Sequence, residues 1–205
     1  MTLLQLNTSL FSNAGQSSRL ADRFVTNRKA GDPALDVVVR DLAREPIPHL
    51  TAERFQAFLA KPEARTADEQ AVVAESDVLI DELKNADVVV IGLPMYNFGV
   101  PSQLKAYFDH VARAGVTFKY TETGPVGLLG GKKVYVFATR GGVYSGTPRD
   151  VETAYVRQFL GFLGMDDVEF VYAEGLAVSD SSRQAALAKA ANAIDRIGDV
   201  ERLAA

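Results

Sequence analysis

Hydrophobic positions along this chain fall into short continuous runs that are separated by longer stretches of mixed polarity. The continuous runs occupy residues 2–7, 35–40, 87–93, 133–138 and 168–173. Each has the length of a strand, and the run at 87–93 is apolar on both faces, which is typical of parallel strands covered by helices on both sides. The pattern therefore predicts five buried parallel strands.

The stretches between these runs carry apolar residues at helical spacing, as Leu20, Phe24 and Val25 do in the first of them. Helices are expected at residues 16–29, 52–59, 67–84, 102–113, 149–163 and 181–197. Strands that alternate with helices imply an open parallel sheet with right-handed crossovers. Five strands fit a flavodoxin-like α/β fold, a three-layer sandwich with strand order 2-1-3-4-5, better than a six-stranded dinucleotide-binding sheet.

Residues 115–131, "GVTFKYTETGPVGLLGG", do not fit this alternation of strands and helices. The segment is too irregular for a simple crossover, and we expect a small hairpin there. The chain shows no internal repeat, low-complexity segment or linker. Its 205 residues are therefore expected to form a single domain over residues 1–205.

Composition excludes several classes of function. Lys plus Arg is 22 and Asp plus Glu is 26, without a long run of one sign, which argues against nucleic acid or an anionic membrane as partner. The chain has no cysteine and only two histidines, so we expect no disulfide, thiolate site or metal site. No secretory signal and no apolar run of membrane-spanning length is visible, and the expected location is the cytoplasm.

Ligands of such sheets bind at the carboxyl ends of the strands, so the loops that follow the first, third and fourth runs are read together. The first, "NTSLFSNAGQSSRLAD", is rich in hydroxyls and leads into a helix whose N-terminus can hold a phosphate. Ser9, Gln16 and Ser17 could add side-chain donors. The loop matches neither GxxxxGK[ST] nor GxGxxG. Its simplest alternative is a helix start that is capped by serine.

The loop after the third run, "PMYNFGVP", carries two aromatics, an amide and a glycine between two prolines. Met95, Tyr96 and Phe98 could lie against a flat ring system, while Asn97 and the loop amides bond its polar edge. Gly99 would allow positive φ or a close approach. The alternative is that Tyr96 and Phe98 only close the end of the core.

The loop after the fourth run, "ATRGGVYSGTP", brings Thr139, Gly141 and Gly142, whose backbone could approach a ligand closely, and Arg140, which could sit near a negative edge. Alone it reads as an ordinary glycine-rich turn. Together the three loops supply a phosphate cradle, a flat apolar slot and donors for a ring edge. Flavin mononucleotide (FMN) has these three parts, whereas NAD would need a second nucleotide half-site.

Four segments carry a specific resemblance: "PMYNF", "VPSQLKAYFDHVARAGVTFKYTETGPVGLL", "TRGG" and "FLGFLG…FVYAEG". They closely resemble the bacterial FMN-dependent NADH:quinone oxidoreductases, also called FMN-dependent NADH-azoreductases, from Ser9 to about Gly175. The resemblance implies a flavodoxin-like homodimer that binds one FMN noncovalently per subunit. It also implies NADH or NADPH as donor, and quinones or aromatic azo compounds as acceptors, in ping-pong order.

The resemblance implies chemistry centred on the flavin, with no catalytic side chain. The family's FMN contacts fall on Ser9, Gly15, Gln16, Ser17, Met95, Tyr96, Asn97, Phe98, Thr139, Arg140, Gly141 and Gly142. We expect amides around Asn97 and Phe98 to bond the flavin N5/O4 edge, and amides or side chains near 140–142 to stabilise its N1/O2 edge. Two departures stand out: Gly15 replaces a frequent serine, and Tyr144 stands where some relatives have histidine.

Aromatic side chains are expected to wall the slot over the flavin: Phe98, Phe118, Tyr120, Tyr144 and Phe162. Phe118 and Phe162 are candidates to come from a partner subunit, with ordinary core packing as the alternative. Glu174 ends the last strand and could hold a neighbouring loop. The rival functions are a flavodoxin-like FMN electron carrier or sensor that does not use NADH, and a binding module without redox chemistry.

Overall fold

The computed structural model describes residues 1–204, with the side chains of residues 1–197. Five parallel strands form one sheet in the order β2-β1-β3-β6-β7, which is the predicted arrangement once a separate hairpin is numbered β4 and β5. The strands of the sheet are β1 (Thr2–Asn7), β2 (Asp36–Asp41), β3 (Val88–Pro94), β6 (Lys133–Thr139) and β7 (Asp167–Ala173).

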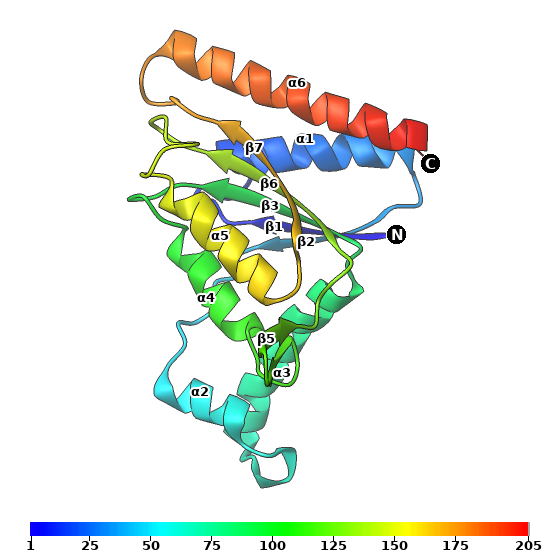
Figure 1. Cartoon of the computed structure of the whole chain (residues 1–205), viewed down its shortest axis with the longest axis vertical. Coiled ribbons are helices and arrows are strands. Elements are labelled where there is room, and N and C mark those ends of the chain that lie inside the picture. Colours follow the sequence, from blue (N-terminus) through cyan, green and yellow to red (C-terminus); the bar gives the residue numbers. More distant parts are fainter. Residues whose placement is uncertain (205) are drawn as a thin grey trace.

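Helices cover both faces of this sheet (Figure 1). On one face lie α1 (Gln16–Gly31) and α6 (Asp180–Ala204), and on the other α3 (Ala67–Asn85), α4 (Ser102–Val111) and α5 (Val151–Phe162). The short α2 (Ala52–Leu59) packs on α3, and two 3-10 helices span Ser12–Ala14 and Pro62–Ala64. This arrangement confirms the predicted flavodoxin-like α/β fold.

Successive strand residues serve opposite faces of the sheet, which explains the continuous apolar runs. Leu3 and Val90 pack in the core beneath α1 and α6, whereas Leu4 and Ile91 pack in the core beneath α3, α4 and α5. All seven residues of β3 are buried, because this strand lies in the middle of the sheet. The prediction of strands buried on both faces is confirmed.

Helix boundaries differ from the prediction by a few residues. The helix predicted from residue 149 begins at Val151, because the Asp150 side chain accepts a hydrogen bond from the Thr153 N–H and caps it. The helix predicted to reach residue 113 ends at Val111, since the Arg113 N–H turns to the Thr117 hydroxyl. The last helix continues past residue 197.

The irregular segment contains the expected hairpin, β4 (Phe118–Thr121) and β5 (Gly124–Gly127). It lies against the C-terminal end of α5, and a Cβ at Gly127 would fall 2.0 Å from the Gly164 nitrogen. Figure 1 shows β5 beside the lower ends of α4 and α5, away from the edge where the strands of the sheet end. Within one chain, the hairpin thus lies near the C-terminal end of α5, whereas the β6–α5 loop at the carboxyl edge of the sheet lies at its N-terminal end.

Candidate functional site

The three loops singled out from the sequence meet at the carboxyl edge of the sheet. We name them the β1 loop (residues 8–15), the β3 loop (residues 95–101) and the β6 loop (residues 140–150). The Thr8 hydroxyl donates to the Gly92 carbonyl at 2.8 Å, and the Met95 N–H donates to the Thr139 carbonyl at 3.0 Å. The Ser9 and Tyr96 hydroxyls lie 3.4 Å apart. Contacts between adjacent strands therefore bring the predicted residues of all three loops together.

The start of α1 holds polar groups without partners. Among the described residues, the N–H groups of Gln16, Ser17 and Ser18 have no acceptor, and the buried hydroxyls of Ser17 and Ser18 make no hydrogen bond. A helix N-terminus with unpaired donors favours an anion. A phosphate group fits this donor set, and its oxygens would satisfy groups that otherwise cost about 1–3 kcal/mol each when buried.

Two glycines let this end of α1 approach its neighbours. A Cβ at Gly15 would lie 2.2 Å from the Ser9 hydroxyl oxygen, which gives a steric reason for glycine at this departure from the family pattern. A Cβ at Gly92 would lie 3.0 Å from the Ser17 carbonyl oxygen, so glycine in β3 lets the helix sit close to the strand. The sequence reading missed Gly92, although a lone glycine inside an apolar run is the usual signal of such an approach.

The β3 loop is a tight turn with strained backbone. The Tyr96 and Gly99 backbones exchange two hydrogen bonds of 3.0 Å, and the residues between them, Asn97 and Phe98, have φ of 50° and 66°. These angles are those of a type I′ turn, which normally uses glycine or asparagine. The positive φ predicted for Gly99 is wrong, and no other protein atom approaches it closely, since the nearest atom to an added Cβ is 3.9 Å away.

Strain of this kind concentrates at functional sites and costs about 1–3 kcal/mol per residue. The N–H groups of Asn97 and Phe98 donate no hydrogen bond within the described part of the chain. The Phe98 ring is 55% exposed, while the Tyr96 hydroxyl accepts from the Leu10 N–H at 3.3 Å and ties the β3 loop to the β1 loop. Of the two aromatics, Phe98 therefore faces outward and Tyr96 has a structural contact.

The β6 loop presents a row of unpaired donors. The carbonyls of Arg140, Gly141 and Gly142 accept hydrogen bonds of 2.8–3.1 Å from residues 175–177. The N–H groups of Gly141, Gly142 and Val143 find no acceptor among the described residues. A main chain whose oxygens are all held on one side leaves its donors free for a ligand with a negative edge.

The Arg140 side chain does not face that ligand position. Its guanidinium is fully buried and contacts Asp150 at 2.7 Å, Glu174 at 3.1 Å, Glu152 at 3.3 Å and the Thr153 hydroxyl at 2.8 Å. The positive charge is therefore neutralised inside the protein. The Arg140 N–H is also paired, because it donates to the Ala173 carbonyl at 3.0 Å, so neither the side chain nor the main-chain donor of this residue is free to meet a negative ligand edge.

Three carboxylates around one guanidinium cannot all be ionised at low cost. Burial raises the pKa of Glu152 to about 8, against a smaller opposite effect of Arg140. Burial also acts to raise the pKa of Asp150, but hydrogen bonds from Arg140 and Thr153 outweigh it and lower that pKa. Burial thus favours the protonated form of Glu152, while the hydrogen bonds from Arg140 and Thr153 favour the anion of Asp150, as the directions of their pKa shifts show.

Of the aromatics predicted for the slot, only Phe98 and Tyr144 lie at this edge, where their rings meet at 5.6 Å with an interplanar angle of 71°. Phe118 packs against Phe162 at 4.4 Å and against Tyr120 at 5.5 Å, beside the hairpin. The 12 residues of α5 separate that cluster from the β6 loop, a length of about 18 Å. One chain therefore does not bring all five rings together, and Phe118 is part of its own core.

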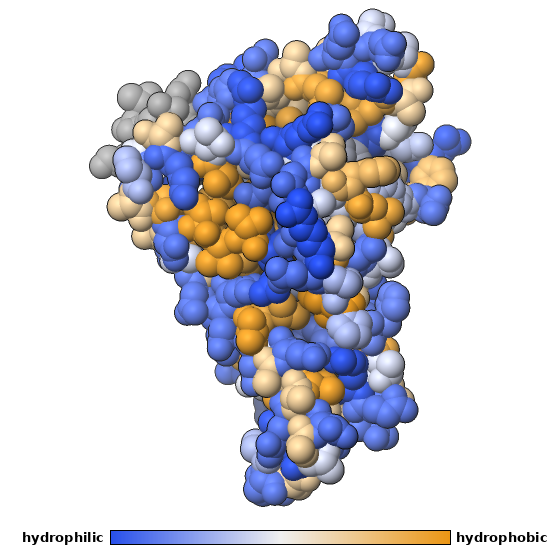
Figure 2. All heavy atoms as spheres, turned by 180° about the vertical axis from the view of Figure 1, so that it is seen from behind, coloured by the Kyte–Doolittle hydropathy of each residue, from blue (hydrophilic) through white to orange (hydrophobic). Residues whose placement is uncertain are grey.

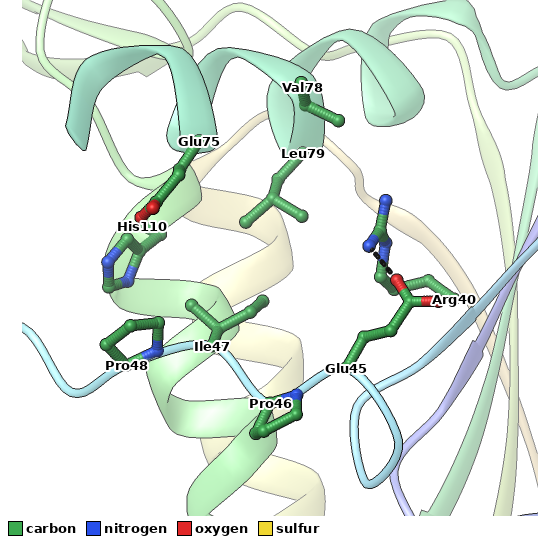
Figure 3. Close-up of a pocket in the computed structure, with 9 residues that line it drawn as sticks. All are labelled: Arg40, Glu45, Pro46, Ile47, Pro48, Glu75, Val78, Leu79 and His110. Atoms are coloured by element: carbon green, nitrogen blue, oxygen red, sulfur yellow. Dashed lines mark hydrogen bonds and ion pairs between the residues drawn. The ribbon is translucent and has the colours of Figure 1, made fainter. Parts of the chain in front are cut away.

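A separate groove lies between α3, α4 and the segment that follows β2 (Figure 3). It has a volume of about 430 Å³, and Ile47 and Leu79 face one another across it. His110 at its edge is fully buried: burial lowers the pKa of the ring, and Nδ1 lies 2.9 Å from the Ala106 carbonyl. None of the residues predicted to bind a ligand lines this groove.

The surface of the described residues carries few other features. Seen from behind, its apolar side chains form separate patches divided by polar residues (Figure 2). Among the described residues no cluster of three or more histidine, aspartate or glutamate side chains could hold a metal ion. Over the same residues, no helix combines the length and apolarity that crossing a membrane requires.

Comparison with known proteins identifies the family. A model of the flavodoxin-like fold matches residues 1–197. The chain is 55% identical over 188 residues to an FMN-dependent NADH:quinone oxidoreductase of Cellvibrio japonicus, covering 92% of this chain and 94% of that protein. It is 53% identical to FMN-dependent NADH:quinone oxidoreductase 6 of Burkholderia lata, covering 94% of this chain and 98% of that one.

Two solved structures share the fold over nearly the whole chain. Azoreductase AzrA superposes with a TM-score of 0.88 at 31% identity, covering 97% of this chain and 99% of that chain. An FMN-dependent NADH-azoreductase of Bacillus anthracis in complex with FMN superposes with a TM-score of 0.85 at 28% identity, covering 96% of this chain and 99% of that chain. The chain therefore belongs to the flavodoxin-like family that includes the FMN-dependent NADH:quinone oxidoreductases.

Proposed function

We propose that this protein is an FMN-dependent oxidoreductase that takes electrons from NADH or NADPH and gives them to quinones or aromatic azo compounds. The observation that carries the proposal is the convergence of unpaired donors from three loops at one edge of the sheet. When bound, FMN would accept a hydride from the nicotinamide and pass two electrons to the acceptor, in ping-pong order.

The protein's part is to bind and orient the cofactor. The N-terminus of α1, with Ser9, Gly15, Gln16 and Ser17, fits the phosphate, because the N–H groups of Gln16 and Ser17 and the Ser17 hydroxyl lack partners within the described part of the chain. The turn at Asn97 and the β6 loop fit the two polar edges of the ring system through main-chain donors. The remaining contacts are proposed for Met95, Tyr96, Phe98, Thr139, Arg140, Gly141 and Gly142.

We further propose a homodimer, with one FMN per subunit, because the aromatic wall is incomplete in one chain. Tyr120 is 75% exposed on the hairpin and stacks edge-on against Phe118, at the end of the chain away from the three loops. A second copy that presents this hairpin and Phe162 to the flavin would complete the slot. Tyr144 would then be the wall residue supplied by the same chain as the β6 loop.

The first experiment is an anaerobic absorbance titration of the purified protein with NADH, followed by a benzoquinone. A yellow protein that bleaches with NADH and recovers its colour with quinone supports both half-reactions. A yellow protein that NADH and NADPH leave unbleached would indicate the electron carrier instead. A colourless protein that binds no added FMN would contradict the proposed site.

Asn97→Ala tests the donor turn of the β3 loop. We expect slower flavin reduction by NADH in stopped-flow measurements, because the substitution alters a turn whose φ of 50° alanine adopts poorly. Asn192→Ala is the matched control, since that exposed residue lies in α6, far from the three loops. Reduction kinetics that are equal in the two variants would argue against the proposed contact at Asn97.

A further inference from the structure

We infer that Glu174 is a positioning residue that fixes the β6 loop, and with it Tyr144, against the flavin site. The inference rests on the proposed function and deepens it, because it assigns the loop's shape to one carboxylate oxygen, which accepts three hydrogen bonds from the protein. It concerns how tightly the ring edge of the cofactor is held and how the nicotinamide and acceptor reach it.

A single oxygen of Glu174 organises the turn of the loop. Its Oε1 accepts hydrogen bonds from the N–H groups of Tyr144 and Ser145, both at 2.9 Å, and from Nη1 of Arg140 at 3.1 Å. The three N–H groups before Tyr144 have no acceptor, whereas the next two point inward to this oxygen. The carboxylate therefore stands where the loop's donors change from ligand-facing to protein-facing.

Arg140 holds the carboxylate in place. The guanidinium is buried between Glu174, Asp150 and Glu152, and the Tyr172 ring lies 5.0 Å from its central carbon. Because Glu174 directly follows β7 and Glu152 lies in the first turn of α5, the cluster ties the loop to the helix that follows it and to the end of a strand distant in sequence. A glutamate held in this way has little freedom, so its two N–H contacts restrain the loop.

The position of the Tyr144 ring follows from the loop rather than from its own hydroxyl. The hydroxyl makes no hydrogen bond within the described part of the chain, and the ring lies over Gly142, where a Cβ would fall 2.6 Å from the hydroxyl oxygen. Its neighbour on the other side is Phe98. A shift of the main chain at Tyr144 would therefore move the ring between the β3 and β6 loops.

Two conservative changes separate the hydrogen bonds of Glu174 from its charge. Glu174→Gln removes the charge but keeps an oxygen of the same reach, while Glu174→Asp keeps the charge but withdraws the oxygen by one methylene. We expect Glu174→Asp to raise the Kd for FMN and to slow flavin reduction by NADH by about tenfold each, which corresponds to about 1.4 kcal/mol for the lost contacts. Glu174→Gln should stay within about threefold of wild type.

Glu82→Asp is the matched control. Glu82 is a half-buried carboxylate of α3 that pairs with Arg40, away from the three loops. The Glu82→Asp variant should unfold more easily than wild type, without a change in FMN affinity or in the rate of flavin reduction. Glu174→Asp and Tyr144→Ala should also be non-additive in a double-mutant cycle on the rate of flavin reduction, because the first acts through the second.

The inference is overturned if Glu174→Asp matches Glu82→Asp, if Glu174→Gln loses as much as Glu174→Asp, or if the double-mutant cycle is additive. The proposed function fails in a different way, through a wild-type protein that binds no FMN or is not reduced by a nicotinamide. A wild-type protein that passes both tests while Glu174→Asp behaves normally contradicts only the positioning role.

Discussion

The β3 and β6 loops offer unpaired N–H groups to the same edge of the sheet, yet they are held by different forces. The β3 loop is shaped by its own backbone, through two hydrogen bonds between Tyr96 and Gly99 and positive φ at the residues between them. The β6 loop is shaped by the buried charge of Arg140, which pairs with Asp150 at the loop's own end and with Glu174 directly after β7. Local geometry thus suffices for one donor row, whereas the other needs tertiary contacts.

Substitutions in the two loops should therefore change the stability of the fold in different directions and by different amounts. Positive φ at a residue other than glycine costs about 1–3 kcal/mol, so relieving it should stabilise the fold. Removing one partner of a buried ion cluster costs about 3–5 kcal/mol, because the remaining charges stay buried without compensation. The β6 loop is the more fragile of the two, and the changes below at Arg140, Glu152 and Phe98 test that ranking.

Arg140→Met is expected to have the largest effect. It leaves the carboxyl groups of Asp150, Glu152 and Glu174 without their shared cation, and should lower the free energy of unfolding by about 3–5 kcal/mol in urea titrations. Arg40→Met is the control, since Arg40 pairs with Glu45 and Glu82 but is 18% exposed. If the two variants lose the same free energy of unfolding, the buried cluster contributes no more to stability than the partly exposed one.

Glu152→Gln should have an effect that depends on pH. The folded protein raises the pKa of Glu152 from 4.5 to about 8, so folding takes up a proton between these values, and wild-type stability falls as pH rises through this window. The glutamine variant escapes this loss and should gain on wild type by at most about 1.4 kcal/mol per pH unit, levelling off above pH 8.

Urea unfolding of both proteins at pH 5, 7 and 9 measures this difference. If the free energy of unfolding of Glu152→Gln minus that of wild type stays constant or falls as the pH rises, the raised pKa is contradicted. The same comparison sharpens the contrast between the loops, because no titratable contact of this kind supports the turn from Tyr96 to Gly99.

Phe98→Gly should be more stable than Phe98→Ala by about 1 kcal/mol. Both substitutions remove the exposed ring, but only glycine adopts a φ of 66° without strain, and Asn-Gly is the preferred pair of a type I′ turn. The difference in thermal or urea unfolding isolates the strain from the lost ring. Equal stability of the two variants would show that the β3 loop stores none.

Tyr120→Ser should have the smallest effect on stability, within about 0.5 kcal/mol, because the side chain is 75% exposed. If a second copy brings the hairpin to the loops, the variant should nevertheless lose kcat/KM for quinones. Tyr120→Phe, which keeps the ring, is the control. Unchanged turnover in Tyr120→Ser would mean that the loops form the site without the hairpin.

Much of the fold and of the site was predictable because the signals are local. A run of apolar residues is a property of consecutive positions, and the carboxyl ends of parallel strands always meet at one edge, so the loops that carry Ser17, Asn97 and Gly142 could be placed at the same edge of the sheet. The errors concern conformations that neighbours decide. Gly99 was expected to take positive φ, but the two-residue turn places it outside the strained pair.

By itself, the sequence determined the five strands, the helices between them and the three loops, because periodicity and turn chemistry depend on neighbouring residues. Only the tertiary structure decided the partners of Arg140. From the sequence its positive charge was predicted to meet a ligand, but the start of α5 brings Asp150 and Glu152, and the end of β7 brings Glu174, to surround it in the interior. A buried charge must be compensated by whatever the fold brings near, and spacing along one chain does not show which carboxylates those are.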